Sequence, residues 1–292
     1  MARLDRLRIP PCPRCCGERY PRWFELVQGH AAMTSSLVNN QGTRPSKATI
    51  LITDYAWPDL AIERAVIEGA GLHLVHGPAQ PAAADHITEL VKTHQPQAIL
   101  TCWAQVNAQA IAASASLMHV GRIGVGLDNI DVAACTQRGV LVTNVPDYCV
   151  EEVSDHAVGM ALAWARGLLR FDRAVRNGQW NPAQAQLRRM AKLTVGIVGF
   201  GRIGRASARK FQAFGCRVLA HARHTPIDTQ GVQHSSLDTL LAQSDIVVLH
   251  IPLTEDTRGL IDAKRIAMMK SGALLINVSR GAVVDTAALT AA

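Results

Sequence analysis

The chain has 292 residues, of which 48% are hydrophobic and only 4% aromatic, so an aliphatic core large enough for two domains can form. The net charge of +7 is concentrated at one end, because residues 1–47 carry a net charge of +5 and the rest only +2. The near-neutral remainder argues against nucleic-acid binding, and no apolar run is long enough to cross a bilayer. We therefore predict a soluble cytoplasmic protein without a nucleic-acid or membrane partner.

The first 47 residues show no sustained helix or strand periodicity and are rich in proline. We interpret residues 1–47 as a disordered extension or as an artefact of a misassigned start, for which Met33 is an alternative. Cys12, Cys15 and Cys16 have the spacing of half a zinc site, but no second ligand pair follows, so no metal site is predicted. The other cysteines lie among apolar segments, which is typical of buried reduced thiols. They are Cys102, Cys135, Cys149 and Cys216.

From residue 48 onward, short apolar segments rich in β-branched residues alternate with amphipathic ones. This alternation predicts an open parallel sheet whose strands are connected by helices. The strands are expected at residues 48–53, 72–76, 97–101, 118–123 and 140–145. The helices are expected at residues 60–70, 85–95, 106–113 and 129–138.

A longer amphipathic segment at residues 150–175 predicts one continuous helix that ends at Asn177 and Gly178. A second series of strands and helices follows it. Its strands are expected at residues 193–198, 217–221, 246–251 and 273–278. Its helices are expected to begin near Arg202, Ser236 and Asp262, and residues 286–292 have the pattern of the first turns of another helix. The sequence therefore predicts an α/β protein with two doubly wound parallel sheets.

The turn after the first strand of the second series contains Gly199, Gly201 and Gly204 in the spacing Gly-x-Gly-x-x-Gly. Between an apolar strand and a helix, this spacing predicts a dinucleotide-binding site of the Rossmann type. The first glycine permits a tight turn, the second lets a pyrophosphate approach the backbone, and the third lets helix and strand pack closely. Arg202 and Ile203 lie in the same turn, at a helix N-terminus that attracts phosphate. The alternative is a glycine-rich turn without a ligand.

The end of the next strand bears on the choice of nicotinamide cofactor. An acidic residue that binds the ribose hydroxyls of NAD is expected there, but the chain has Ala222, Arg223 and His224. Without that carboxylate the 2′-phosphate of NADP is not repelled, and Arg223 could bind it through two N–H groups. We therefore predict NADP, or NAD with loose selectivity if Arg223 is only a solvated loop residue.

Three motifs together carry a family resemblance: residues 120–131, the glycine turn at 199–204, and residues 250–257. The first is followed by residues 139–146 and the third by 277–285. The order and spacing of these segments match those of one known protein family. On these motifs the chain, over about residues 48–292, resembles the D-isomer-specific 2-hydroxyacid dehydrogenase family. In residues 148–155 it looks most similar to the branch that contains the C-terminal-binding-protein corepressors and phosphoglycerate dehydrogenase.

The resemblance implies two domains with a cleft between them. Residues 48–149 would be a flavodoxin-like domain that binds the substrate. Residues 150–292 would be a Rossmann domain that binds NADP or NAD. The resemblance also implies a small 2-hydroxy or 2-keto acid as the substrate.

The resemblance also implies a role for individual residues. The backbone N–H groups of Gly124, Val125 and Gly126 would bind the substrate carboxylate. Arg280 would be the catalytic arginine, because a guanidinium can contact the carboxylate and the carbonyl of a 2-keto acid at once. Other residues would border the nicotinamide. They are Ile251, Pro252, Asn277, Val278 and Ser279.

The family also uses a histidine as proton donor and a glutamate that supports it, both downstream of the catalytic arginine. The eleven residues after Gly281 contain neither, and the last histidine, His250, lies where the family contacts the cofactor. The resemblance therefore implies a C-terminally truncated chain with an incomplete Rossmann domain. We expect the truncated chain to be poorly soluble and inactive by itself.

The function expected of the intact protein is hydride transfer between a nicotinamide cofactor and a small D-2-hydroxy acid or 2-keto acid. Two alternatives remain open: a non-catalytic dinucleotide-binding scaffold, as among the corepressors, and the remnant of a decayed gene. Members of the family are usually dimers through the dinucleotide domain and its long helix. The resemblance therefore implies a homodimer interface at residues 150–178 if the protein is complete.

Overall fold

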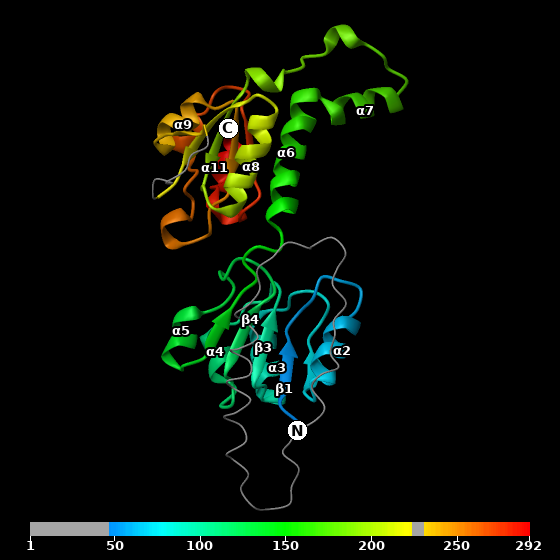
Figure 1. The fold of residues 1–292 in the computed structure, drawn as a ribbon, viewed down its shortest axis with the longest axis vertical. Coiled ribbons are helices and arrows are strands. Elements are labelled where there is room, and N and C mark those ends of the chain that lie inside the picture. Colours follow the sequence, from blue (N-terminus) through cyan, green and yellow to red (C-terminus); the bar gives the residue numbers. More distant parts are fainter. Residues whose placement is uncertain (1–46, 224–230) are drawn as a thin grey trace, which may run out of the picture. The chain divides into compact units, whose positions relative to one another are not determined.

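The computed structural model describes residues 47–223 and 231–292. The extension predicted for residues 1–47 lies outside the described residues, except for Lys47, and so do its three cysteines and His224. The described residues form two five-stranded parallel sheets with helices between the strands (Figure 1). The predicted α/β class with two doubly wound sheets is therefore confirmed.

The first sheet has the strand order β2-β1-β3-β4-β5, which is the flavodoxin-like order. Its strands are β1 Thr49–Ile52, β2 His73–His76, β3 Ala98–Thr101, β4 His119–Arg122 and β5 Leu141–Thr143. All neighbouring strands are parallel. The five strands lie where the alternation of apolar segments predicts them.

The helices of the first sheet are α2 Ala61–Gly69, α3 Ala84–His94, α4 Ala108–Ala112 and α5 Val132–Gln137. The last two begin later than predicted, because Val106 and Ile130 form a parallel bridge instead of helical turns. Asn107 and Asp131 then cap the helices, each accepting a hydrogen bond of 2.9 Å from a backbone N–H three residues on.

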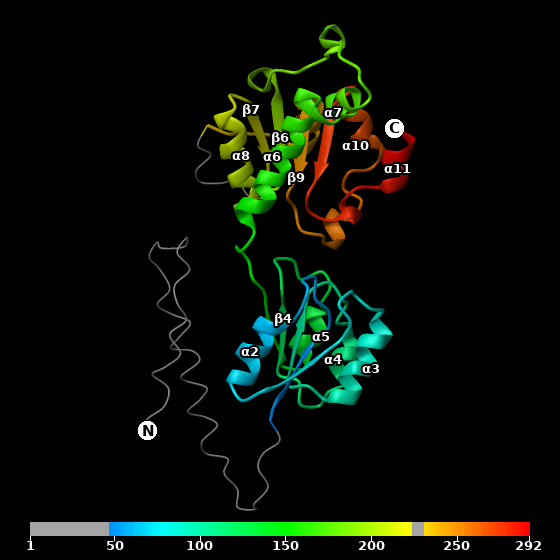
Figure 2. The same ribbon diagram turned by 90° about the vertical axis from the view of Figure 1, so that its right-hand side faces the viewer.

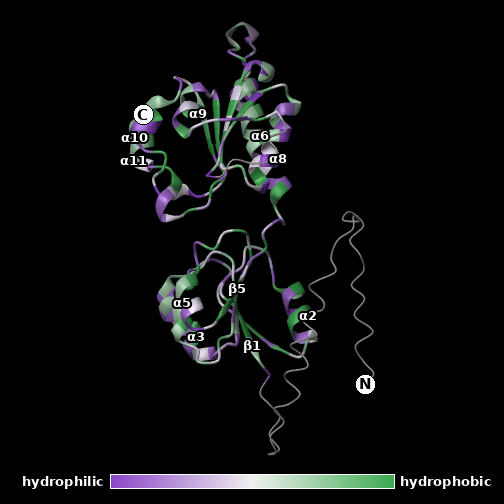
Figure 3. Cartoon of the chain, turned by 60° about the vertical axis from the view of Figure 1, so that its left-hand side comes forward, coloured by the Kyte–Doolittle hydropathy of each residue, from purple (hydrophilic) through white to green (hydrophobic). Residues whose placement is uncertain are grey.

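Successive residues of a strand bury opposite faces of the sheet. Leu51 packs with residues of α3, α4 and α5, whereas the next residue, Ile52, packs with Leu60 and Leu74 on the other face. Figure 3 shows the hydrophobic colouring gathered on the strands and on one side of the helices. Burial on both faces explains why the sequences of these strands are continuous apolar runs.

The second sheet has the order β8-β7-β6-β9-β10, which is 3-2-1-4-5 within its own series and matches the Rossmann order. Its strands are β6 Thr194–Val198, β7 Arg217–His221, β8 Gln233–His234, β9 Ile246–Leu249 and β10 Leu274–Asn277. The short β8 is not predicted from the sequence, because a Gln-His pair carries no apolar alternation. It is defined by its pairing with Leu219 and Ala220 of β7.

The prediction of one continuous helix over residues 150–175 is wrong. The structure has two helices, α6 Val150–Arg166 and α7 Leu168–Arg176, separated by Gly167. Gly167 has a left-handed backbone (φ 62°), which ends α6 and changes the direction of the chain. The amphipathic pattern continues through the glycine, so periodicity alone does not reveal the break.

The remaining helices of the second sheet are α8 Arg202–Ala213, α9 Leu237–Gln243, α10 Ala263–Met268 and α11 Thr286–Ala291. Helices α6 and α8 pack side by side on one face (Figure 2). Ile246 and Val248 of β9 face this pair, whereas Val247 and Leu249 face α9. Within the described residues, β10 forms one edge of the sheet and β8 the other.

Four free cysteines lie in the described residues. Cys102, Cys135 and Cys216 are buried, as predicted, and Cys149 is half-buried. None of the helices in the described part of the chain has the length and apolarity required to span a membrane.

Candidate active site

The glycine turn joins β6 to α8 and is shaped by its three glycines. Gly199 has a φ of 98° and donates a backbone hydrogen bond of 2.8 Å to the carbonyl of His221. A Cβ at Gly199 would lie 2.5 Å from the carbonyl oxygen of His250, and a Cβ at Gly204 would overlap the carbonyl oxygen of Gly199. Two of the glycines are therefore required by close backbone approach.

Gly201 differs from the other two, because a Cβ there would meet no atom within 4 Å. It is the N-cap of α8, and Arg202 and Ile203 form the first turn of that helix. The turn therefore leaves open space in front of a helix N-terminus, where N–H groups and the helix dipole favour a phosphate. This open space fits the pyrophosphate of a dinucleotide.

Two further segments follow the carboxyl ends of β9 and β10. Ile251 and Pro252 follow β9, and Ile251 lies beside Gly199. Asn277 is the last residue of β10, and its Oδ1 accepts hydrogen bonds from the backbone N (3.0 Å) and the hydroxyl (2.8 Å) of Ser279. Its Nδ2 donates to the carbonyl of Arg280 at 2.8 Å, so this amide fixes the backbone before the arginine.

The loop of Gly124, Val125 and Gly126 follows β4 in the first sheet. Val145 donates a backbone hydrogen bond of 3.1 Å to the Gly124 carbonyl, and Asn144 Nδ2 donates one of 2.7 Å to the Val125 carbonyl. Within the described part of the chain, the backbone N–H groups of the three residues have no acceptor. The loop is therefore braced through its carbonyls, and its N–H groups are available to an anion.

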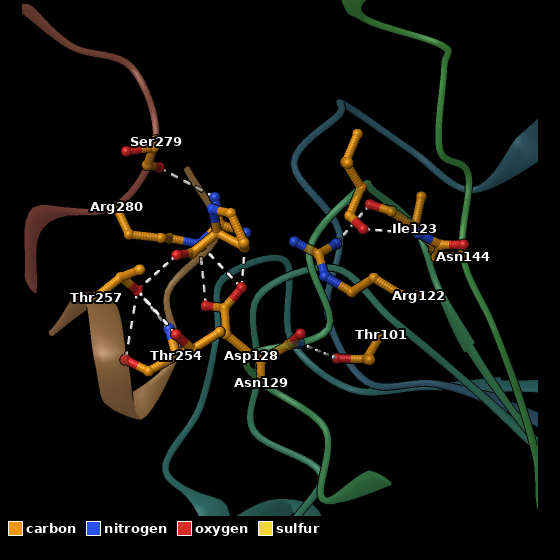
Figure 4. Close-up of polar contacts among 12 residues, drawn as sticks. Thr101, Arg122, Ile123, Asp128, Asn129, Asn144, Thr254, Thr257, Ser279 and Arg280 are labelled. Atoms are coloured by element: carbon orange, nitrogen blue, oxygen red, sulfur yellow. Dashed lines mark hydrogen bonds and ion pairs between the residues drawn. The ribbon is translucent and has the colours of Figure 1, made fainter. Parts of the chain in front are cut away.

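Arg280 reaches this loop from the second sheet (Figure 4). A Cβ at Gly126 would overlap Nη2 of Arg280, so the guanidinium lies directly against the loop. The guanidinium also forms a bidentate ion pair with Asp128: Nε lies 3.0 Å from both carboxylate oxygens and Nη2 lies 2.8 Å from one. Burial acts to raise the pKa of Asp128, but the hydrogen bonds and charge of Arg280 outweigh it and lower the pKa.

A second arginine that the sequence analysis missed flanks the same loop. Arg122 ends β4, is only 8% exposed, and donates a hydrogen bond of 2.6 Å from Nη1 to the carbonyl of Ile123. The same Nη1 would lie 2.6 Å from a Cβ at Gly124, and Nε is buried without a partner in the described structure. The sequence could have indicated Arg122 as a site residue, because it is an arginine inside an apolar strand and next to the predicted glycine loop.

Asp54, which is fully buried just after β1, was also not predicted from the sequence. Its carboxylate accepts hydrogen bonds from the backbone N–H groups of Cys102 (3.0 Å) and Trp103 (2.7 Å), and from the Thr53 hydroxyl (2.7 Å). Burial and the Asp54 charge raise the pKa of the Cys102 thiol, although Arg122 opposes them. This shift favours the protonated form of the Cys102 thiol, which is less nucleophilic than a thiolate.

Among the described residues, Arg223 contacts Asp256 and none of the site residues above. It follows β7, its side chain is 70% exposed, and its Nη2 forms an ion pair of 3.0 Å with Asp256. The described residues contain no cluster of three or more side chains suited to hold a metal ion.

The fold and the glycine turn define the class of two-sheet α/β proteins that bind dinucleotides. The sequence model described as "D-isomer specific 2-hydroxyacid dehydrogenase, NAD binding domain" matches residues 158–292. A glyoxylate reductase of Thermococcus kodakarensis is 38% identical over 211 residues, which are 68% of this chain and 63% of that protein.

Solved structures agree with the family model. A glyoxylate reductase from Paecilomyes thermophila superposes with a TM-score of 0.74 at 30% identity, over 85% of this chain and 78% of the other. A D-lactate dehydrogenase from Aquifex aeolicus, complexed with NAD and lactic acid, has a TM-score of 0.73 at 29% identity, over 82% and 72%. The chain belongs to the D-isomer-specific 2-hydroxyacid dehydrogenase family. It spans less than two thirds of the length of the glyoxylate reductase that it matches in Thermococcus kodakarensis.

Proposed function

We propose that this protein is an oxidoreductase that transfers a hydride between NADP or NAD and a small D-2-hydroxy acid or 2-keto acid. The observation that carries the proposal is the position of Arg280, whose guanidinium lies against Gly126 in a loop with free N–H groups. A carboxylate and an adjacent carbonyl would fit between these donors. The domain boundaries that go with this function are residues 48–149 for substrate and 150–292 for dinucleotide.

In this proposal the dinucleotide supplies or accepts the hydride when bound. The N–H groups of Gly124 to Gly126 bind the substrate carboxylate, and the charge of Arg122 beside Gly124 adds to their attraction for an anion. Arg280 orients the carbonyl and stabilises the negative charge that develops on its oxygen. Asn277 and Ser279 hold the segment that positions Arg280.

Binding of glyoxylate in the presence of saturating NADP+, which cannot reduce it, tests the proposed substrate site directly. Calorimetric titration of the 292-residue chain should show one glyoxylate site. Arg280→Ala should weaken glyoxylate binding about a hundredfold, because it removes charged hydrogen bonds worth about 1.5–3 kcal/mol each. The affinity for NADP+ should not change. If Arg280→Ala bound glyoxylate as tightly as the wild type does, the proposal would lose its basis.

The cofactor preference for NADP is a separate proposal that depends on Arg223. The Arg223→Ala variant should lose about tenfold in affinity for NADPH and little for NADH, because only NADPH has the 2′-phosphate. Asp256→Asn is the matched variant. It removes the carboxylate that competes for Arg223, so NADPH should bind more tightly and NADH as before. Fluorescence titration measures the affinities of the wild type and both variants for NADPH and NADH, and tighter NADH binding by the wild type would contradict the preference.

We also propose that the protein is a homodimer through residues 150–178. Leu168, Leu169 and Val175 are 55%, 69% and 55% exposed on α7, so this helix has three apolar side chains that a partner could bury. Leu169→Glu should shift sedimentation from dimer to monomer. Ile62→Glu, at a residue that is 78% exposed on α2, should leave the dimer intact. A monomeric wild-type chain would refute the proposal.

A further inference from the structure

The donors of Arg280 are divided between two partners. A guanidinium has five N–H groups. Nε and Nη2 donate to Asp128, and Nη1 donates to the Ser279 carbonyl at 3.0 Å. One N–H on Nη1 and one on Nη2 remain without an acceptor among the described residues. These two donors are the pair that a 2-keto acid would require.

Asp128 is itself held in place. It lies two residues after Gly126, and a Cβ at Gly126 would be 2.6 Å from its Oδ1. The next residue, Asn129, donates from Nδ2 to the Ala104 carbonyl at 2.9 Å and so ties this loop to the segment after β3. The side chains of Asp128 and Arg280 are only 26% and 37% exposed. The carboxylate is therefore a fixed point to which the guanidinium can be aligned.

A bidentate carboxylate restricts an arginine more strongly than a single contact does. The two parallel hydrogen bonds set both the position and the plane of the guanidinium. Without them, the long side chain of Arg280 would keep its charge but sample several rotamers. A substrate that binds the two remaining donors would then have to order the side chain itself.

From this geometry we infer that Asp128 is a positioning residue for Arg280, which aligns the two free guanidinium donors with the Gly124–Gly126 loop. Asp128 does not contact the substrate; it acts through the arginine. The inference rests on the proposed function, because it takes the ligand to be a 2-keto acid or 2-hydroxy acid.

The test is a double-mutant cycle on glyoxylate binding to the full chain with saturating NADP+. Asp128→Asn keeps the size of the side chain but loses the charge. It should weaken glyoxylate binding about tenfold and leave the NADP+ affinity and the melting temperature unchanged. Arg280→Lys removes the planar fork that Asp128 aligns, so in that background Asp128→Asn should have almost no further effect. A merely structural role would give additive losses instead.

Glu68→Gln is the matched control, because Glu68 forms an ion pair with Arg64 (2.6 Å) on α2. It should leave glyoxylate binding unchanged. Equal binding by Asp128→Asn and the wild type would overturn the inference alone, and so would full additivity with Arg280→Lys. Failure of the wild-type chain to bind glyoxylate, with NADP+ bound, would overturn the proposed substrate and this inference together.

Discussion

Gly201→Ala and Gly204→Ala should fail in opposite ways, although the two glycines lie three residues apart in one turn. A methyl group at Gly204 would overlap the backbone carbonyl of Gly199 and lie 3.3 Å from Ile197 Cγ2. Backbone cannot move aside as a flexible side chain can, so Gly204→Ala should lower the free energy of unfolding by about 2–3 kcal/mol. Dinucleotide binding should be lost with the packing.

Gly201→Ala should instead leave the fold intact. Its φ of −79° suits alanine, and no atom lies within 4 Å of the new methyl group. The methyl group occupies the space that we assign to the pyrophosphate, so NADPH affinity should fall at least about tenfold. Urea unfolding and NADPH titration separate the two effects. Unchanged NADPH binding by Gly201→Ala would show that the pyrophosphate does not lie there.

The stability of the protein should fall by about 3 kcal/mol as the pH drops from 7 to 4, because of His250. Burial lowers the pKa of this imidazole to about 4, and its Nε2 lies 2.9 Å from the Ser207 hydroxyl. The unfolded chain takes up a proton near pH 6.5, whereas the folded chain resists protonation until about pH 4. A tenfold difference in proton affinity is worth about 1.4 kcal/mol, which gives the stated loss.

His250→Asn should remove most of this pH dependence, since asparagine can accept the Ser207 hydrogen bond without titrating in this range. The measurement is urea unfolding of both proteins at intervals between pH 7 and pH 4. His94→Asn, at an exposed histidine on α3, controls for the loss of a histidine as such. An identical pH slope in the wild type and His250→Asn would mean that other groups cause the acid destabilisation.

Much of the fold follows from local patterns. Nine of the ten strands lie where short apolar segments predict them, because strands buried on both faces must be apolar throughout. The break at Gly167 and the strand β8 were missed for a shared reason. Neither changes the apolar pattern, and both are defined by backbone conformation or by pairing with a distant strand.

In the candidate site, too, some residues could be predicted from local motifs and others could not. The glycine turn and Arg280 belong to motifs that can be recognised in the sequence, and their roles remain predictions. Asp128 and Asp54 were not identified, because their partners come from other segments of the chain, whereas Arg122 was overlooked although it contacts its neighbours Ile123 and Gly124. Asp54, for example, bonds backbone groups 48 and 49 residues away, and only the folded sheet brings them together.

The contact between Arg280 and Asp128 joins residues 152 positions apart in the chain. Each sheet can form from strand pairings that are much closer in sequence. The chain between Asp128 and Arg280 is a long loop, and closing it is favourable only after both sheets have formed. The arrangement of the arginine should therefore be the last part of the structure to assemble during folding and the first to be lost. Mild denaturant should abolish ligand binding while the helical circular dichroism is still that of the native protein.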